Sequence, residues 1–250
     1  MNIVHPAHSK NYYYFPDDNT CLTATELQMI VDCVHSSKFL TEKDTERLID
    51  KLLLLCSKSE ANTLKDTSRY SRPTKNHNPD TLTNLGIIRQ GIAQDQQIAF
   101  RYGQYNADKK LIGKPDERVV SPLQLIYCDD NYYLIAWNNA HENVITYRID
   151  RIIGQARLLN ESREHVHSFS DYDKKYYTQQ SFHMFGGEQT EVTMVCQNQI
   201  MNIVIDQFGY DVHVHKVDED HFSISPKVCA SNQFFGWLMG LNGAIQITGP

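Results

Sequence analysis

The chain has 250 residues, of which 41% are hydrophobic and 22% are charged, and its formal net charge is −6. This length predicts one large domain or two to three small ones with a real hydrophobic core. The negative charge is the wrong sign for a protein whose whole surface binds nucleic acid. Strong affinity for duplex DNA is therefore expected to lie elsewhere, although a local basic groove is compatible with the composition.

The lack of a recognisable targeting signal and the pattern of the cysteines predict a cytoplasmic protein. No apolar run approaches the roughly 20 residues of a membrane span, and no signal-peptide pattern opens the chain, so no membrane partner is expected. The six cysteines are scattered without metal-ligand spacing. They predict reduced, mostly buried thiols of a cytoplasmic protein.

The first 80 residues predict a hairpin, two helices and a linker. Two short strands flank a polar turn within residues 2–15. The capping patterns Thr23-x-x-Glu26 and Thr41-x-x-Asp44 each open a helix with an apolar face. Residues 58–80 show no helical periodicity and predict an extended basic linker, which either faces DNA in a full-length protein or is a solvated loop. Its basic residues are Lys65, Arg69, Arg72 and Lys75.

A helix and several short strands follow. Apolar residues at helical spacing predict a helix over residues 84–94, and alternation predicts a strand over 98–102. Three β-branched and aromatic runs, separated by Asp- and Asn-containing turns, predict antiparallel strands over 122–127, 132–137 and 144–149. Together they predict a small SH3-like or Sm-like β-barrel that ends near residue 160.

The remaining sequence predicts a second module. Ser170 caps a predicted connecting helix that ends near Gly186. Residues 191–250 then show the order strand, helix, strand, strand, helix, strand, with the third strand over 221–228. This is the order of the ferredoxin-like arrangement. The predicted fold class is therefore α+β, with N-terminal helices, a small barrel and a C-terminal ferredoxin-like βαββαβ domain.

Basic residues stand at the ends of the predicted barrel strands. Arg118 precedes the first of the three runs, and Arg148 and Arg151 close the third. Guanidinium groups offer planar, forked donors for phosphate or carboxylate. On a regular strand Arg148 and Arg151 face opposite sides, so they converge only if the chain bends at Asp150. Alternatively, Arg151 is paired with Asp150 or with a neighbouring carboxylate.

Three further residues complete the candidate ligand site. Tyr102 and Tyr133 are candidate aromatic walls for a base or a sugar, or else packing residues. His141 lies in the predicted loop 138–143 and is either a ligand contact or an exposed loop residue. We expect the three arginines to gather around one concavity of the barrel and to bind an anionic small molecule or single-stranded nucleic acid.

Catalytic and metal-binding patterns do not emerge from the sequence. The pairs His213-x-His215 and His165-x-His167 put two imidazoles on one side of a strand, but neither has a third ligand at suggestive spacing. There is no Gly-x-Ser-x-Gly elbow, P-loop or His-Glu-x-x-His motif. We expect no cofactor, no bound metal and no enzymatic activity.

The segment from Arg118 to Ile152 resembles a known domain. Its ordered features are Arg118, Pro122, the triplet Tyr132-Tyr133-Leu134 and the closing run Tyr147-Arg148-Ile149-Asp150-Arg151-Ile152. This set resembles the WYL domain of bacterial transcriptional regulators of the YafY/DeoR-like type. The chain departs from the family pattern at Tyr132, where the family has Trp, and at Ile145, where an Arg is often found.

The resemblance implies an organisation for the whole chain. Residues 1–15 correspond to the wing of an N-terminal winged helix-turn-helix, 16–80 to a helical connector and linker, and 81–165 to the WYL domain. Residues 166–190 form a connecting helix, and 191–250 a C-terminal extension. The helices that would precede the wing are missing, so we interpret the chain as a fragment that contacts duplex DNA through a missing N-terminal domain; the alternative is a naturally short homologue.

Two hypotheses follow from the sequence. The first is a ligand-sensing and dimerisation part of a homodimeric WYL regulator, in which an anionic effector binds the basic pocket of the barrel. The second is an accessory module that binds nucleic acid or a protein directly, without small-molecule sensing. The salt dependence of binding separates them, because a strand held through several phosphates weakens steeply with added salt.

Overall fold

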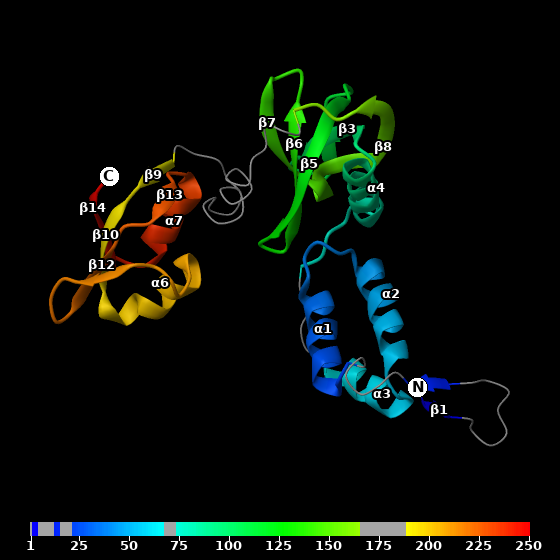
Figure 1. Cartoon of the computed structure of the whole chain (residues 1–250), viewed down its shortest axis with the longest axis horizontal. Coiled ribbons are helices and arrows are strands. Elements are labelled where there is room, and N and C mark those ends of the chain that lie inside the picture. The colour runs from blue at the N-terminus through cyan, green and yellow to red at the C-terminus, as the bar shows by residue number, and fades with distance from the viewer. Residues whose placement is uncertain (1, 5–12, 16–21, 68–73, 166–188) are drawn as a thin grey trace.

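The structure, a computed structural model, describes residues 2–4, 13–15, 22–67, 74–165 and 189–250 (Figure 1). The predicted N-terminal hairpin is present as two short antiparallel strands, β1 (Asn2–Val4) and β2 (Tyr13–Phe15). The predicted connecting helix after Ser170 lies outside the described residues.

The described part of the helical connector contains three α-helices where two were predicted. Helix α1 (Ala24–Ser36) begins at the predicted Thr23 capping box, and α2 (Glu42–Leu52) begins after Thr41, whose hydroxyl accepts a hydrogen bond from the Asp44 amide. A single 3₁₀ turn (Leu53–Leu55) follows.

The expectation that residues 58–80 form an extended linker is wrong in its first half, where α3 (Lys58–Thr67) lies. Two local features explain the helix. Ser57 and Glu60 form a reciprocal cap, because the Glu60 amide donates to the Ser57 hydroxyl and the Ser57 amide donates to the Glu60 carboxylate. Leu64 is buried against Leu27 and Val31 of α1. Arg69 and Arg72 lie outside the described residues.

The middle of the chain forms a curled antiparallel sheet covered by one helix. Five strands are ordered β4-β3-β5-β6-β7, and β8 pairs with β3. The sheet therefore curls into a half-barrel, with α4 packed against it (Figure 1). A bulge between Pro122 and Gln124 interrupts the β5–β6 ladder, as expected where proline has no N–H to donate. The elements are α4 (Thr81–Ala93), β3 (Gln96–Tyr105), β4 (Leu111–Gly113), β5 (Arg118–Cys128), β6 (Asn131–Asn138), β7 (Asn143–Arg148) and β8 (Ile152–Ser162).

The helical connector shares its core with the half-barrel. Phe39 and Leu40, in the turn between α1 and α2, are 2% and 7% exposed and belong to the same buried cluster as Phe100, Leu134 and Tyr147. The Phe39 ring lies edge-on to Tyr132, with 4.8 Å between the ring centroids. Burial of two large side chains therefore fixes this turn on the sheet.

The C-terminal module is mixed α+β, as the fold class predicted. Its main sheet has the order β11-β12-β10-β14 with every neighbouring pair antiparallel, and two helices lie between its strands in the chain. The helices and this sheet share one core, which includes Met194, Val204 and Phe234. The strands of this sheet are β10 (Thr193–Gln197), β11 (Val214–Lys216), β12 (His221–Ile224) and β14 (Ile245–Gly249), and the two helices are α6 (Met201–Phe208) and α7 (Asn232–Gly240).

The single strand predicted over 221–228 is instead divided in two. β12 ends at Ile224, and β13 (Lys227–Cys229) pairs with β9 (Gln189–Glu191) in a separate two-stranded sheet. Pro226 stands at the division, where its missing N–H cannot continue the ladder, and its carbonyl accepts a hydrogen bond from the Val192 amide. The ferredoxin-like and SH3- or Sm-like assignments remain predictions.

Candidate functional site

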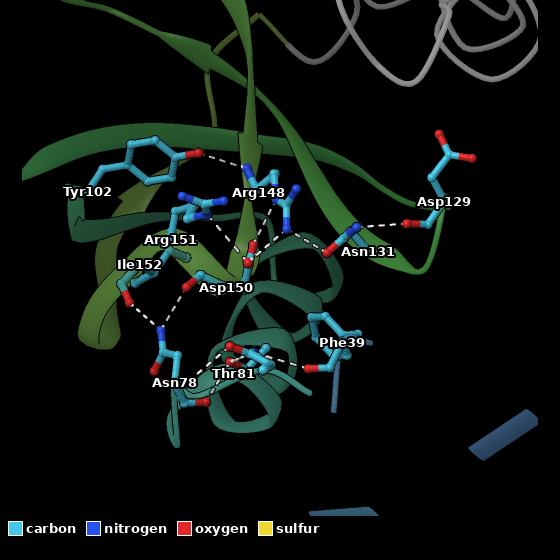
Figure 2. Close-up of polar contacts among 11 residues, drawn as sticks. Phe39, Asn78, Thr81, Tyr102, Asp129, Asn131, Arg148, Asp150, Arg151 and Ile152 are labelled. Carbon is cyan, nitrogen blue, oxygen red and sulfur yellow. Dashed lines mark hydrogen bonds and ion pairs between the residues drawn. The ribbon is translucent and has the colours of Figure 1, made fainter. Parts of the chain in front are cut away.

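Two arginines converge on one buried carboxylate at the end of β7. A 3₁₀ turn over Ile149–Arg151 bends the chain, and the Asp150 it carries is 7% exposed. Arg148 donates from Nε to Oδ1 of Asp150 at 3.0 Å and from Nη2 to Oδ2 at 2.9 Å (Figure 2). Nε of Arg151 lies 3.4 Å from Oδ2. The bend that the sequence required is present, and we call Arg148, Asp150 and Arg151 the Asp150 cluster.

Neighbouring polar groups hold this cluster in place. Asn131 Oδ1 accepts from Arg148 Nη2 at 2.7 Å, and the Tyr102 hydroxyl accepts from the Arg148 amide at 2.9 Å. Asn78 donates from Nδ2 to the carbonyls of Asp150 at 3.1 Å and Ile152 at 2.7 Å (Figure 2). The segment before α4 and the strands β3 and β6 thus all orient the same turn.

The electrostatics of the cluster follow from partial burial. Burial alone lowers the pKa of Arg148, but the hydrogen bonds and charge of Asp150 outweigh it and raise that pKa above its ordinary value. Burial raises the pKa of Tyr102, so its hydroxyl stays neutral. Arg148 is therefore a permanent cation with 34% of its side chain exposed.

A pocket of about 300 Å³ adjoins the cluster. Its lining combines three cations, Lys38, Lys75 and Arg148, with one carboxylate, Asp150, so the lining residues carry a surplus positive charge, while Asp130 lies outside the lining and 3.6 Å from Lys38. Tyr105 contributes an aromatic wall, and the guanidinium carbon of Arg151 lies 4.9 Å from the centre of its ring. The other lining residues are Thr74, Asn76, His77 and Asn131. We call this cavity the connector pocket.

Some of the predicted site residues meet at this cluster and others do not. Arg148, Arg151 and Tyr102 come together around Asp150. Tyr133 lies directly opposite Arg148 in the β6–β7 ladder, but it is only 7% exposed and packs with Ile126 and Ile135. Its position is that of a packing residue rather than of an open wall.

Arg118 lies on the other face of the sheet. It is opposite Phe100 in the β3–β5 ladder, and opposed residues share a face, here that of the central core. Tyr147 also lies in that core, so alternation places Arg148, the next residue, on the opposite face. The structure therefore does not gather the three guanidiniums around one concavity.

His141 is remote from the cluster. It is exposed in the turn of the β6–β7 hairpin, whereas Arg148 lies at the open end of the same hairpin. Five strand residues separate the turn from Arg148, which is on the order of 15 Å at about 3.3 Å per residue. His141 thus has the position of an exposed loop residue, which was one of the two alternatives, and it does not adjoin the Asp150 cluster.

Sequence reasoning did not assign Lys38, Asn131, Tyr105 and His77 to the site, and it placed Lys75 in a basic linker. Lys38 follows α1 and lies far along the chain from Arg148, so only the docking of Phe39 and Leu40 brings it near. Asn131 could have been predicted to lie near Arg148, because it begins β6, the strand that pairs with β7. The pairing of Arg151 with Asp150 was among the predicted alternatives, but the pairing of Arg148 with the same carboxylate was not.

The paired histidines do not form a metal site in the described part of the chain. His213 and His215 are exposed and line a pocket of about 510 Å³ beside Asp211 and Glu191. Across the described residues, no three His, Cys, Asp or Glu side chains are placed to hold a metal ion. His167, of the other pair, lies outside them. The five cysteines of this part are free, but only Cys196 and Cys229 are buried. Cys56 and Cys128 are partly exposed and Cys33 is exposed, so the expectation of mostly buried thiols is wrong for the described residues.

Comparison with known proteins gives the class of the half-barrel. Residues 83–157, from α4 into β8, match the family model described as the WYL domain, so a WYL domain is present in the chain. This confirms the part of the sequence resemblance that concerned the presence of a WYL domain. No curated protein sequence matches the chain. None of the helices in the described ranges is long and apolar enough to span a membrane.

Among solved structures, the chain is similar to proteasome accessory factor B/C (PafBC) of Arthrobacter aurescens. The sequence identity is 15% and the TM-score 0.34, and the match covers 92% of this chain and 33% of that chain. The chain thus spans about a third of the length of the protein it matches.

Proposed function

We propose that this chain is the regulatory part of a WYL-domain transcriptional regulator, which senses an anionic effector at the connector pocket. The observation that carries the proposal is the Asp150 cluster. A permanent cation, Arg148, is oriented by Asp150, Asn131 and Tyr102 beside a cavity with surplus positive charge. The WYL domain at this position supports the same reading.

The chemistry of the pocket favours a phosphate-bearing ligand. Arg148 has five N–H donors, and Nη1 makes no hydrogen bond within the described residues. Guanidinium and ammonium groups together suit a dianion, and Tyr105, which has the Arg151 guanidinium over its ring, adds an aromatic surface for a base or a sugar. Of the predicted site residues, only Arg148 is among the lining residues of this pocket. The proposal also keeps Arg151 and Tyr102, which contact Asp150 and Arg148, and it leaves out Arg118, Tyr133 and His141.

Further parts of the proposal concern the whole regulator. The C-terminal module, which we interpret as ferredoxin-like, is proposed to mediate homodimer contacts. Contact with duplex DNA is proposed to be made by another domain of the YafY/DeoR-like type of regulator. Effector binding then changes the affinity for DNA only if the effector binds two arrangements of the dimer with different affinities.

Titration calorimetry with adenosine 5′-monophosphate and with adenosine tests the pocket. Wild-type protein is expected to bind the nucleotide and not the nucleoside, and R148Q to lose at least tenfold in affinity, as for loss of a charge-assisted hydrogen bond of about 1.5–3 kcal/mol. The matched control is R89Q, which removes an exposed arginine on α4. Equal affinity of R148Q and R89Q would remove Arg148 from the site.

A further inference from the structure

The connector pocket lies where two parts of the chain meet. Lys38 lies two residues after the end of α1, whereas Lys75 precedes α4 and Arg148 closes β7. All three line the same cavity. An anion bound between them would therefore contact the helical connector and the half-barrel at once.

The contact between these parts is already ordered by packing and hydrogen bonds. Phe39 and Leu40 are buried in the core of the half-barrel. The Asn76 amide donates to the Leu40 carbonyl at 3.2 Å, and Asn76 Nδ2 donates to the Phe39 carbonyl at 3.1 Å. The turn after α1 is thus a docked element whose position depends on a few defined contacts.

The two lysines are placed to respond to an anion. Lys75 donates from Nζ to the carbonyls of His35 and Ser37, at 2.6 and 3.0 Å, which leaves one of its three N–H groups available. Lys38 lies 3.6 Å from Asp130, and 60% of its side chain is exposed. Such an exposed ion pair contributes little, so Lys38 can exchange Asp130 for a ligand at small cost.

We propose that the connector pocket is a bridging phosphate site, in which Lys38 and Lys75 from the connector and Arg148 from the half-barrel bind one phosphate group. This inference rests on the proposed function and adds the two lysines and their consequence. Because the complete cation set exists only when the turn is docked, phosphate binds the docked arrangement more tightly and holds α1 and α2 on the half-barrel. Ligand occupancy is thereby coupled to the position of the helices.

Binding and hydrogen exchange on the whole chain test the proposal together. The probes are adenosine 5′-monophosphate, adenosine, and a ten-nucleotide oligothymidylate. K38Q is expected to bind the nucleotide roughly fivefold more weakly, as for one partly screened charge contact. K75Q is expected to weaken binding at least as much. The control K51Q removes an exposed lysine at the far end of α2 and is expected to bind like wild type.

Saturating nucleotide should also slow amide exchange at the docked turn. The reporters are the amides of Asn76 and Thr45, which donate to the carbonyls of Leu40 and Thr41. A several-fold slowing in wild type, reduced in K38Q and retained in K51Q, supports the bridge. Unchanged exchange on saturation would overturn the coupling.

The outcomes separate this inference from the proposed function. If R148Q loses binding while K38Q and K75Q keep wild-type affinity, the effector site stands and the bridge is refuted. If wild type binds no phosphate probe, both fail. Tight binding of the mononucleotide assigns the phosphate to a small effector, whereas lysine-dependent binding of the oligonucleotide alone assigns it to a single strand, and either supports the bridge.

Discussion

Replacing Asp150 by Asn should destabilise the half-barrel and strengthen anion binding in the same protein. The Asp150 side chain is 10% exposed and faces two arginine side chains that are 34% and 29% exposed. Removing one member of a fully buried ion pair costs about 3–5 kcal/mol. Because both guanidiniums keep contact with water, screening reduces the expected loss to about 2 kcal/mol.

Denaturation by urea, followed through tryptophan fluorescence, measures this loss. Trp137 lies in β6, and the second tryptophan, Trp237, lies in α7, so W237F in every protein compared leaves Trp137 as the reporter of the half-barrel. The matched control is D116N, which removes an exposed carboxylate before β5. D150N is expected to lower the free energy of unfolding by about 2 kcal/mol and D116N by less than about 0.5 kcal/mol.

The same substitution should increase the affinity for an anion, although it lowers the free energy of unfolding. Without the carboxylate, Arg148 and Arg151 carry uncompensated charge beside the pocket, so D150N is expected to bind adenosine 5′-monophosphate roughly threefold more tightly than D116N. Stability equal to that of D116N, or weaker nucleotide binding, would refute the description of Asp150 as the internal partner of both arginines.

Three further changes test other parts of the structure. F39A should lower the free energy of unfolding by about 3–5 kcal/mol through a core cavity, whereas L54A, at a side chain that is 82% exposed, should lower it by less than 1 kcal/mol, in urea denaturation. S57A should cost about 1 kcal/mol of α3 stability through loss of the reciprocal cap, seen as faster amide exchange over residues 58–67. Burial, and to a smaller extent the Asp129 carboxylate, raise the pKa of Cys128 from 9.0 to about 11. Because the folded state therefore favours the protonated thiol, Cys128 contributes stability below pH 9, and this contribution is lost between pH 9 and 11. Alkylation of Cys128 should accordingly reach half its limiting rate near pH 11 and at lower pH in D129N, and a midpoint near 9 in the parent would contradict this.

Local rules predicted most of the elements from the sequence. The Thr23 and Thr41 caps, the alternating runs of the half-barrel and the helix stopped at Gly209 all depend on residues a few positions apart. The errors arose where a local signal was weak or where another signal overrode it. Helix α3 depends on a Ser57 cap and one buried leucine, and Pro226 divides a run whose β propensity alone predicted one strand.

The site was harder to predict because its members are distant in the chain. The bend at Asp150 and its pairing with Arg151 follow from neighbouring residues, and both appeared among the alternatives. Strand register decides that Arg118 faces the core while Arg148 faces away, and register was not available from the runs alone. Lys38 reaches the pocket only through the burial of Phe39 and Leu40, a tertiary contact without any local signature.

Side-chain NMR of the arginines tests the central claim most directly. Titrating adenosine 5′-monophosphate into the whole chain should shift the Nε–Hε resonance of Arg148 saturably, together with that of Arg151, and leave that of Arg118 unmoved. A saturable shift at Arg118 with Arg148 unchanged would place the ligand on the opposite face of the sheet and contradict the account.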